Sequence, residues 1–528
     1  MKEYRADIVI IGGGIGGFAA ALAAARAGKS VILTEETDWI GGQLTSQAVP
    51  PDENWWIESF GGTYLYRKFR QGVRHYYERN YPLKAEARQV LHLNPGNGAV
   101  SRLCHEPRVA LAVLEEMIAP YRQSGRVTIL LTCKAIEADA HQDRVLSVTV
   151  QNTLTRTSSV LLGSIFVDAT ELGDLLVLSG AEYVSGSESQ QVTGELHAHQ
   201  GDSKPQNMQA ISVCFAMDYL PNEDHTIDRP DSYAFWKDYI PQLRPAWPGK
   251  LLSFTYPIPT TLQSRTAHLF DTATTAHHSL FRYRRIVDKE NFAPGTYQSD
   301  ITLVNWPQID YWLGPICEVE ESIAQKHLEG ARQLSLSFLY WLQTDAPRPD
   351  GGTGYPGLRL RPDVVGTEDG LAKYPYIRES RRIKALFTVT EEHVGKEMRG
   401  LPKAESFPDS VGIGHYNIDL HPSTEGDNYI DVPSLPFQIP LGSLIPVRMQ
   451  NLLPACKNIG TTHITNGCYR LHPVEWNIGE SVGYLASYCI DHDILPVGVH
   501  GTPTHLSDFQ RLLVSQGIEL SWPNIGPQ

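Results

Sequence analysis

The sequence predicts an α/β fold, in which a discontinuous Rossmann-like domain that binds a dinucleotide is interrupted by an α+β domain. Three observations support this class. A glycine-rich turn joins an apolar strand to an alanine-rich helix near the N-terminus. Apolar segments suited to the same sheet return near residues 165 and 451, and a long stretch rich in aromatic residues and proline separates them. At roughly 100–200 residues per domain, 528 residues allow two to four units.

The glycine-rich turn lies in "IVIIGGGIGGF", residues 8–18, directly after the first strand. A helix over residues 18–27 and a strand over residues 30–34 should follow. In this setting G-x-G-x-x-G is typical of a dinucleotide-binding turn. One glycine makes the tight turn, the next lets the backbone touch a pyrophosphate, and the third lets helix and strand pack closely. The helix N-terminus would present N–H groups to the phosphates. The predicted contact residues are Gly12, Gly14, Ile15, Gly16 and Gly17.

Glu35 follows the second strand directly, at the spacing of ~20 residues that is expected of a ribose-binding acid, and Glu36 comes after it. Its carboxylate would accept hydrogen bonds from an adenosine ribose and repel a 2′-phosphate. FAD or NAD is therefore favoured over NADP. A second G-x-G-x-x-G on a strand–helix unit is not evident, so we expect no dedicated NAD(P)H domain.

Composition and charge argue against several other classes. The formal net charge is -14 without a basic tract, which disfavours nucleic acid as a partner. Seven cysteines without a C-x-x-C disfavour a disulfide framework, a zinc ribbon and an iron–sulfur site. We expect no signal peptide, and the longest apolar runs fall short of the ~18 residues of a membrane span. The expectation is a cytoplasmic protein with reduced thiols and a small-molecule substrate; a homodimer stays open.

Further motifs decide between FAD and NAD. They are "WIGGQLTS", "FVDATELGD", "LVNWPQIDYW", "YPYIRESRRI", "VGIGHYNIDLH", "PFQIPLGSLIP" and "GES". With the glycine-rich turn and Glu35, they resemble the bacterial FAD-dependent oxidoreductase family (FAD_oxidored type) of the glutathione-reductase-like two-dinucleotide-binding-domain flavoproteins. The resemblance spans nearly the whole chain. It implies an FAD enzyme but no particular substrate. The related flavin subunits of heterodisulfide reductases carry iron–sulfur cysteine runs, which this chain lacks.

The resemblance implies a discontinuous Rossmann-like FAD-binding domain with an inserted α+β substrate domain. The inserted domain should hold a mixed sheet with helical excursions that cover the flavin. The expected divisions are residues 1–187 and 436–492 for the FAD-binding domain, 188–435 for the substrate domain and 493–528 for a C-terminal tail that packs on the body. Expected elements are strands within residues 126–139 and 145–168, one long helix over 319–345, a buried strand at 451–455 and a helix starting at Gly479.

The same resemblance implies further cofactor contacts. The second Gly-Gly segment would run along the pyrophosphate and ribityl chain, a strand backbone would lie beside the adenine, and the last helix would face the flavin ring. Turns without a ligand, a helix N-cap at Asp174 and a plain buried helix are the structural alternatives. The implied residues are Gly41, Gly42, Gln43, Leu44, Thr45, Ala135, Asp168, Ala169, Thr170, Asp174, Gly479, Glu480 and Ser481.

Three histidines are candidates for catalysis. His463 in "GTTHITNG" is the first candidate for a base or hydrogen-bond donor near flavin N5, since in the resembled fold this loop runs past the flavin. His415 and His421 would share one strand face with Asp419, as an Asp–His relay or a site for a polar substrate. A loop-stabilising histidine and a structural polar network are the alternatives. The spacing is not diagnostic of a metal site, and none is predicted.

Arginines in "RESRR" and "LRLR" allow two interpretations. Arg378, Arg381 and Arg382, as helix-start residues, could form ion pairs between domains or clamp a substrate carboxylate. Arg359 and Arg361 permit the same two roles. Asn305 and Asp310 in "NWPQIDY" have the character of turn and cap residues, so we do not expect them to act in catalysis.

The sequence therefore predicts an FAD-dependent oxidoreductase, an oxidase or dehydrogenase. It would oxidise a small polar organic substrate by hydride transfer to flavin N5, and oxygen or another acceptor would reoxidise the flavin. A flavin reductase or monooxygenase reduced by NAD(P)H is the first alternative, and a flavin-bound tRNA-modification scaffold is the second. A third, sulfur transfer, would need a reactive thiol at Cys468. A covalent flavin link through His463 or Cys468 stays open.

Overall fold

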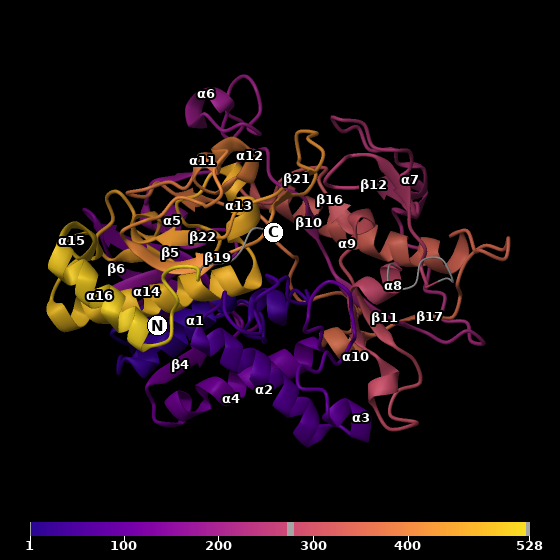
Figure 1. Cartoon of the computed structure of the whole chain (residues 1–528), viewed down its shortest axis with the longest axis horizontal. Helices are drawn as coiled ribbons and strands as arrows, with labels where there is room; N and C mark the ends of the chain where they lie inside the picture. The colour runs from indigo at the N-terminus through magenta and orange to yellow at the C-terminus, as the bar shows by residue number, and fades with distance from the viewer. Residues whose placement is uncertain (1, 272–278, 524–528) are drawn as a thin grey trace.

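The computed structural model describes residues 2–271 and 279–523. Residues 272–278 of the predicted substrate domain and residues 524–528 of the predicted tail lie outside the described residues. In Figure 1 the first and last parts of the chain intermingle on the left, while most of the middle of the chain, with the long helix α9, lies on the right. This arrangement is the discontinuous α/β fold that the sequence predicts.

A five-stranded parallel sheet forms the centre of the part built from the first and last segments of the chain, in the order β23-β8-β2-β3-β4. Its strands are β2 (Ile8–Ile11), β3 (Val31–Thr34), β4 (Val127–Leu130), β8 (Ile165–Asp168) and β23 (Leu452–Pro454). All residues of β2, β3 and β8 are buried, as expected for parallel strands covered on both faces. The edge strand β23 comes from the far end of the chain, so the sheet is discontinuous in sequence.

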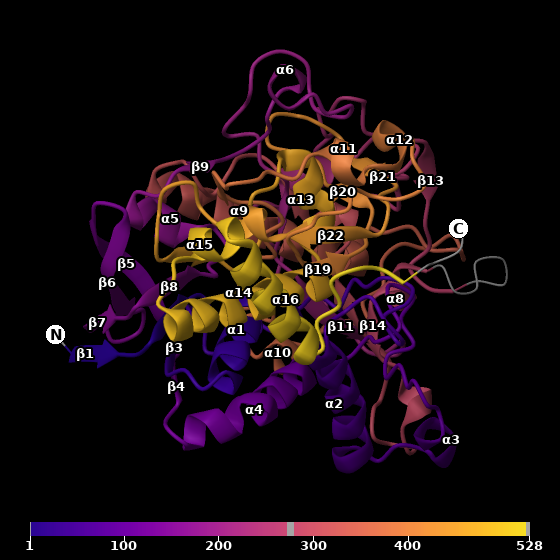
Figure 2. The same ribbon diagram turned by 60° about the vertical axis from the view of Figure 1, so that its left-hand side comes forward.

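Two helices pack against each other beside this sheet, α1 (Ile15–Arg26) and α14 (His472–His492). Figures 1 and 2 both show them side by side. A Cβ on Gly479 would lie 2.0 Å from the Gly16 carbonyl oxygen, and one on Gly483 would lie 2.3 Å from that of Ala20. The absence of these side chains therefore lets the two backbones touch, with both N-termini at the same end.

Two predicted helix starts are wrong. The helix predicted to begin at Gly479 begins at His472, about two turns earlier, because Leu471 is extended and Pro473 suits the first turn of a helix. The first helix begins at Ile15 rather than at residue 18. In both cases the helix starts inside a motif whose glycines or polar residues suggest a loop.

A second sheet has the order β1-β7-β6-β5 and lies at the left of Figure 2. Strands β5 (Cys133–His141), β6 (Arg144–Asn152) and β7 (Ser158–Leu162) form the antiparallel meander that the sequence predicts. Strand β1 (Lys2–Arg5) pairs with β7 in parallel. The chain then returns to the main sheet through β8, as predicted.

The inserted region holds a four-stranded sheet in the order β14-β15-β11-β17. Its strands are β11 (Phe215–Tyr219), β14 (Arg285–Val287), β15 (Ile301–Val304) and β17 (Leu358–Leu360). Every pair is antiparallel, so the predicted mixed sheet is wrong. Helix α9 (Glu321–Thr344) confirms the predicted long helix and packs on a separate, aromatic-rich core.

Helices α2 (Tyr64–Asn80) and α4 (Pro107–Gln123) form a pair at the bottom of Figures 1 and 2. Buried Arg70 of α2 bonds Glu58 at 2.7 Å, and Arg74 bonds the same carboxylate at 2.7 Å. Burial opposes ionisation of Glu58, but the bonds from the two arginines outweigh it and lower its pKa to about 2. This charge cluster ties α2 to the preceding loop.

The predicted division at residue 187 is crossed by hydrogen bonds, because β9 (Tyr183–Val184) pairs with β18 (Arg382–Ile383). Helix α16 (Pro503–Ser515) packs on α14, where the rings of Phe509 and Tyr488 are 5.7 Å apart. The division into domains remains a prediction.

Two local predictions in this region are wrong. "RESRR" does not start a helix, since its last arginine lies in β18. "GHYNIDLH" is not one strand, because residues 415–417 separate β19 (Ser410–Gly414) from β20 (Ile418–Leu420).

The other elements are short and connect or cover these sheets. The remaining strands are β10 (Ile211–Ser212), β12 (Thr255–Pro257), β13 (Ser264–Thr266), β16 (Asp310–Tyr311), β21 (Ile430–Val432) and β22 (Phe437–Pro440). The remaining α-helices are α3 (Ala85–Arg88), α5 (Asp174–Ser179), α6 (Gln190–Thr193), α7 (Tyr233–Asp238), α8 (Leu280–Tyr283), α10 (Pro362–Val365), α11 (Glu391–Val394), α12 (Lys396–Arg399), α13 (His463–Tyr469) and α15 (Pro496–Gly501). The 3₁₀ turns are η1 (Gly42–Leu44), η2 (Lys289–Asn291), η3 (Pro307–Ile309) and η4 (Leu441–Leu444).

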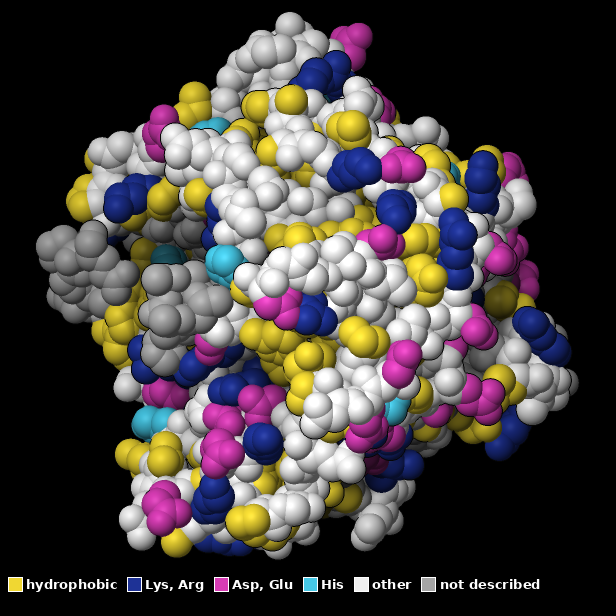
Figure 3. All heavy atoms as spheres, turned by 90° about the vertical axis from the view of Figure 1, so that its right-hand side faces the viewer, with side chains coloured by type: hydrophobic (Ala, Val, Ile, Leu, Met, Phe, Trp, Pro, Cys, Tyr) yellow, Lys and Arg dark blue, Asp and Glu magenta, His cyan; other side chains and the backbone are white. Residues whose placement is uncertain are grey.

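The cysteines and the charged surface side chains are arranged as the composition suggests. All seven cysteines are free, and all but Cys133 are buried. Acidic and basic side chains are interspersed on the face shown in Figure 3. Within residues 2–271 and 279–523, no helix has both the length and the apolar character that crossing a membrane requires.

Candidate active site

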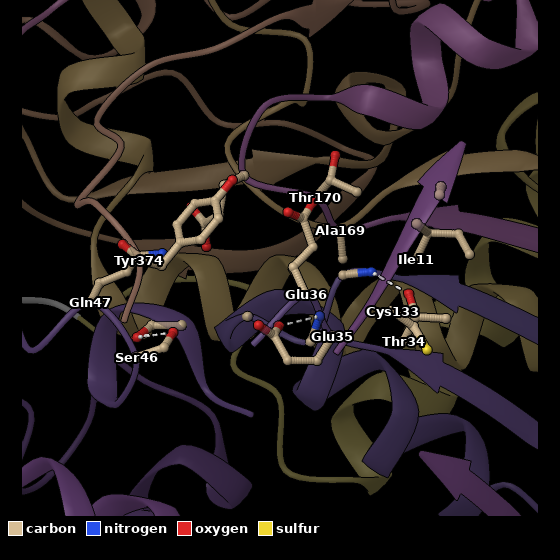
Figure 4. A pocket seen from close by; sticks show the side chains of 16 residues that line it. Ile11, Thr34, Glu35, Glu36, Ser46, Gln47, Cys133, Ala169, Thr170 and Tyr374 are labelled. Atoms are coloured by element: carbon tan, nitrogen blue, oxygen red, sulfur yellow. Dashed lines mark hydrogen bonds between the residues drawn. The ribbon is translucent and has the colours of Figure 1, made fainter. Parts of the chain in front are cut away.

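A narrow cavity, here called the cofactor cavity, opens at the carboxyl end of the main sheet (Figure 4). It lies between the turn that follows β2, the end of β3, and the turn that follows β8. This is where open α/β sheets bind their ligands. The predicted cofactor residues that line it are Gly12, Gly14, Glu35, Glu36, Gly42, Ala135, Ala169 and Thr170.

The glycines of the turn have different surroundings. Gly12 has a φ of +99°, and a Cβ there would lie 2.2 Å from the Ala169 carbonyl oxygen. A Cβ on Gly17 would lie 1.9 Å from the Gly12 oxygen, so this glycine lets helix and strand approach. Near a Cβ on Gly14 lie only carboxylate oxygens, of Glu171 at 3.0 Å and Glu475 at 3.8 Å. Gly12 and Gly17 therefore permit backbone packing, while Gly14 opens the backbone toward the cavity.

Glu35 is buried in the wall of this cavity. The Gly13 N–H donates to its Oε2 at 3.1 Å, and the Thr37 N–H and hydroxyl donate to Oε1 at 2.8 and 2.7 Å. Burial raises the pKa of Glu35 to about 7, although the Thr37 donors oppose this shift. Burial also raises the pKa of Glu36 to about 7, against the charge of Lys134. Two carboxyl groups thus lie at the position predicted for ribose recognition.

A buried charge cluster that the sequence analysis missed lies at the N-termini of α1 and α14. Lys457 forms an ion pair with Glu171, and its Nζ lies 3.8 Å from Glu475 Oε2 and 3.4 Å from Cys456 Sγ. The Gly16 N–H donates to Glu475 Oε1 at 3.2 Å. The ammonium therefore offsets two carboxylates in the region where helix N-termini attract anions. A lysine directly after an apolar strand end is the only signal of this cluster in the sequence.

Three members of this cluster could hold a cation, because ligand atoms of Glu171, Cys456 and Glu475 lie within 4.8 Å of one another. The ammonium of Lys457 already supplies a positive charge there. Burial raises the pKa of the Cys456 thiol well above its usual value, and a protonated thiol is a poor metal ligand. The cluster is therefore better explained as an ion-pair network than as a metal site.

The residues around the cofactor cavity fit a dinucleotide. Buried Gln47 Oε1 and Glu171 Oε1 belong to residues that line it, and neither oxygen has a hydrogen-bond partner among the described residues. Such atoms are usually satisfied by a ligand or by water. Lys457 offsets the carboxylate charge that would otherwise repel phosphates. The narrow shape, the glycine turn and the buried acceptors together suit FAD.

A second cavity of about 770 Å³ is here called the large cavity. Its lining residues differ from those of the cofactor cavity, but two segments of the chain contribute to each: Gln47 lines the cofactor cavity and Asp52 the large one, and Tyr374 lines the cofactor cavity and Tyr376 the large one. The charged and histidine side chains of the large cavity include Asp52, Arg284, Arg378, His415, Asp419, His421 and Arg470. Its aromatic side chains include Trp55, Tyr256, Tyr283, Trp306, Tyr376, Tyr416 and Tyr429.

His421 lies in the wall of the large cavity, next to two carboxylates. Its Nδ1 is 2.6 Å from Asp310 Oδ2, and its Nε2 is 3.7 Å from Asp419 Oδ2. Asp310 also contacts Arg378 at 3.0 Å and accepts a hydrogen bond from Ser212. Burial opposes ionisation of Asp310, but Arg378 and His421 outweigh it and lower its pKa. Asp310, expected only as a turn or cap residue, thus orients the histidine.

The other two histidine candidates lie in different surroundings. His415 lines the large cavity, but burial lowers its pKa to about 4, and its ring packs 5.3 Å from that of Trp56. His463 lines a neighbouring cavity of about 440 Å³, here called the side cavity. Its Nδ1 is 2.8 Å from Glu379, whose charge raises the pKa of His463 against the effect of burial. His421 therefore shares the large cavity with His415 and the side cavity with His463, whereas His415 and His463 line different cavities.

Several predicted cofactor residues make protein contacts outside the cofactor cavity. Asp168 accepts hydrogen bonds from the N–H groups of Thr170 at 2.9 Å and Leu176 at 3.0 Å. Asp174 lies 3.6 Å from Arg381 and is the first residue of α5, so the alternative that it caps this helix is wrong. The N-cap is Gly173. The predicted cofactor roles of Asp168 and Asp174 stay predictions.

The same holds around η1 and α14. Gln43 donates to the Arg470 carbonyl oxygen at 3.1 Å, and Thr45 donates to that of Ile40 at 2.6 Å. Glu480 accepts from the Trp476 indole at 3.0 Å, and Ser481 donates to the Val411 carbonyl oxygen at 2.8 Å. The remaining predicted residues outside the cavity wall are Ile15, Gly16, Gly17, Gly41, Leu44 and Gly479, and all of them are buried.

The predicted arginines are mostly paired. Arg359 and Arg361 both bond Asp218, at 2.6 and 2.8 Å. Arg381 pairs with Glu318, and Arg382 pairs with Glu379 and Glu188. Arg378 pairs with Asp310, within the predicted substrate domain, and also lines the large cavity; its predicted role as a clamp for a substrate carboxylate stays a prediction. The sequence analysis missed Arg284, which is considered below.

Solved structures that are similar to this chain resemble it only distantly. p-Nitrophenol 4-monooxygenase PnpA from Pseudomonas putida DLL-E4 has 9% identity and a TM-score of 0.36 over 98% of this chain and 88% of that one. The myxobacterial chondrochloren halogenase CndH has 11% identity and a TM-score of 0.34 over 96% and 79%. L-Proline dehydrogenase from P. horikoshii has 16% identity and a TM-score of 0.18, and the match covers 36% of this chain and only 25% of that one.

A comparison with curated proteins finds no match. The family model described as FAD dependent oxidoreductase matches residues 7–513, which is nearly the whole chain. That range includes the glycine turn, both carboxyl groups at the end of β3, the large cavity and α14. The cofactor cavity and this match point to the same cofactor, and the chain belongs to the FAD-dependent oxidoreductase family.

Proposed function

We propose that this enzyme oxidises a small polar organic substrate bound in the large cavity. The observation that carries the proposal is the position of this cavity. Two segments of the chain contribute to the walls of both cavities, and the large cavity contains a histidine held by a buried carboxylate. When FAD is bound, it supplies a hydride acceptor at N5. The side chains described below would have to bind the substrate and remove a proton.

The chain's own residues divide into those that hold the cofactor and those that act on the substrate. The backbone of residues 12–14, Glu35 and Gln47 would bind FAD, and Lys457 would offset part of the carboxylate charge that would otherwise repel its phosphates. The N-terminus of α14 lies beside that of α1 and would favour negative charge on the same ligand.

His421 is the proposed base. Its Nε2 would accept the proton that the substrate releases, while Asp310 holds Nδ1–H and stabilises the imidazolium. This division of roles needs Asp310 to stay ionised, and the low pKa of this carboxyl group supports that. His415 would help to shape the cavity as a neutral ring. His463 faces Glu379 in the side cavity and would act on the substrate only from there.

Oxygen or another acceptor would then remove the electrons. The large cavity has ample space for a metabolite, because ligand pockets typically span about 300–1,000 Å³.

Reduction of the flavin by NAD(P)H is the rival proposal. Sulfur transfer is not favoured, because Cys468 is buried and its thiol pKa is raised well above the usual value.

The test begins with an absorption spectrum of the purified protein before and after acid denaturation. A flavin band that leaves with the supernatant would identify non-covalent FAD. Amines, amino acids and alcohols are then screened anaerobically for bleaching of that band. Bleaching by one of them that His421→Asn slows supports the proposal. Bleaching by NAD(P)H alone, with none from any organic substrate, would favour the reductase or monooxygenase alternative.

A further inference from the structure

The large cavity contains a buried arginine that the protein leaves almost without partners. Arg284 is 8% exposed and precedes β14. Its Nε and Nη1 are buried and have no hydrogen-bond partner among the described residues. Its closest acidic partner is Asp52, whose Oδ2 lies 3.6 Å from Nη2. That distance is too long for a hydrogen bond.

The other two buried arginines of the cavity are much better satisfied. Arg378 contacts Asp310 at 3.0 Å and donates to the Ala210 carbonyl oxygen at 2.8 Å. Arg470 contacts Asp419 at 3.0 Å and also donates to a tyrosine hydroxyl. Each of these two guanidinium groups leaves only Nε without a partner. Free donor capacity is therefore concentrated on Arg284.

A buried guanidinium with unmade hydrogen bonds is costly, and proteins keep such groups where a ligand satisfies them. Asp52 does not remove this cost. Its Oδ1 is also buried without a partner, and burial raises its pKa, which weakens it as a counter-ion. An incoming anion could therefore bind Arg284 without first breaking a close ion pair.

The geometry of a guanidinium and the cavity wall restrict the anion. Nε and one Nη of an arginine form a planar fork that matches the two oxygens of a carboxylate. The Tyr283 ring centroid lies 5.3 Å from the Arg284 guanidinium, and Tyr256, Trp306 and Tyr376 are buried residues that line the same cavity. Such rings suit a flat, apolar body and are poor partners for a fully hydrated ion.

We propose that the substrate is an aromatic carboxylic acid, whose carboxylate binds the side-on fork of Arg284, with one oxygen at the unpaired Nε and the other at Nη2, and whose ring lies against the aromatic wall of the large cavity. This inference rests on the proposed function, because it names the substrate class of the same cavity. It also predicts that neutral and cationic analogues bind poorly.

Benzoate is the probe, and its binding is measured calorimetrically with the full-length protein, both loaded with FAD and free of it. Wild-type protein should bind benzoate at least about tenfold more tightly than benzyl alcohol or benzylamine. Arg284→Met should weaken benzoate binding about 100-fold or more, since it removes a buried charge partner. Arg282→Met is the matched control: this arginine also lies near β14, but it pairs with Asp271 and does not line the cavity.

If Arg284→Met fails to fold, Asp52→Asn and Arg284→Lys still test whether Arg284 binds the carboxylate. Asp52→Asn removes the competing carboxylate and should tighten benzoate binding severalfold. Arg284→Lys should retain weak binding, because a lysine keeps the charge but loses the fork. Tighter binding of benzylamine than benzoate, or equal loss in Arg282→Met and Arg284→Met, would overturn the inference.

The heat of benzoate binding and the flavin spectrum separate the two proposals. If benzoate binds through Arg284 but no organic acid ever bleaches bound FAD, the carboxylate site stands and the proposed oxidation fails. If amines or alcohols without a carboxylate bleach the flavin while benzoate does not bind, the oxidation stands and the substrate class is wrong.

Discussion

Adding one methyl group at Gly479 should separate the two helices that flank the cofactor cavity. The new Cβ would lie 2.0 Å from the Gly16 carbonyl oxygen and 2.6 Å from the carbon of the same group. Real Cβ atoms essentially never approach heavy atoms closer than 3.0 Å, so the helices must move apart by about 1 Å. Both contacting groups belong to helix backbones, and neither can rotate away.

The cost follows from the close packing of this interface. Overpacking a well-packed core costs typically 1–3 kcal/mol, and a clash with backbone belongs at about 3 kcal/mol. At about 2 °C per kcal/mol for a large protein, Gly479→Ala should lower the melting temperature by about 6 °C. The FAD content should fall as well, because the shift moves both helix N-termini relative to the cofactor cavity.

Thermal melting followed by circular dichroism, with flavin fluorescence recorded in parallel, tests this expectation. Gly501→Ala is the control, because a Cβ there meets nothing within 4 Å and its φ is ordinary. It should melt within about 1 °C of the wild type. Equal melting temperatures for Gly479→Ala and wild type, with unchanged FAD content, would refute the argument that these helices touch through their backbones.

Three further predictions concern buried charges. Lys457→Met leaves two carboxylates without their counter-ion, so it should lower the free energy of unfolding by about 3–5 kcal/mol and reduce the FAD content. Adding Glu171→Gln should restore part of the lost melting temperature. No recovery would contradict the assigned pairing. His421→Asn should slow substrate-dependent flavin bleaching about 10²–10⁴-fold, and an unchanged rate would exclude it as the base. Glu58 has its pKa lowered from 4.5 to about 2 in the folded protein, so its stabilisation is present above pH 4.5 and lost as the pH falls toward 2. Glu58→Gln should therefore reduce the loss of unfolding free energy over that range by at most about 2 kcal/mol, because solvent screens part of the interaction; parallel wild-type and variant curves of stability against pH would contradict this.

The sequence was most informative where local chemistry decides the structure. The glycine turn, Glu35 and the strands around them could be predicted because a tight turn beside an apolar strand has few alternatives. The long helix α9 follows from its apolar spacing. The start of α14 was missed, because the residues before Gly479 are polar and aromatic and only their burial against other elements makes them helical.

The chemistry of the large cavity was less predictable. His421 was among the candidates, yet its partner Asp310 comes from strand β16, far away in the sequence, and the distance of 2.6 Å between them depends on the folded chain. Arg284 and Lys457 are ordinary charged residues in the sequence. They become notable only because tertiary structure buries one without a partner and the other among two carboxylates. Burial of this kind has no local signature.

The order of strands in the main sheet has a consequence for how the chain is made. Strand β8 pairs on one side with β2 and on the other with β23, and β23 is synthesised only after the entire inserted region. Until then the nascent protein carries an open β edge, and the face of α1 that α14 will cover is bare. Chains that end before residue 452 would keep both the open edge of β8 and the uncovered face of α1. Such unfinished chains should therefore aggregate more readily than the folded enzyme.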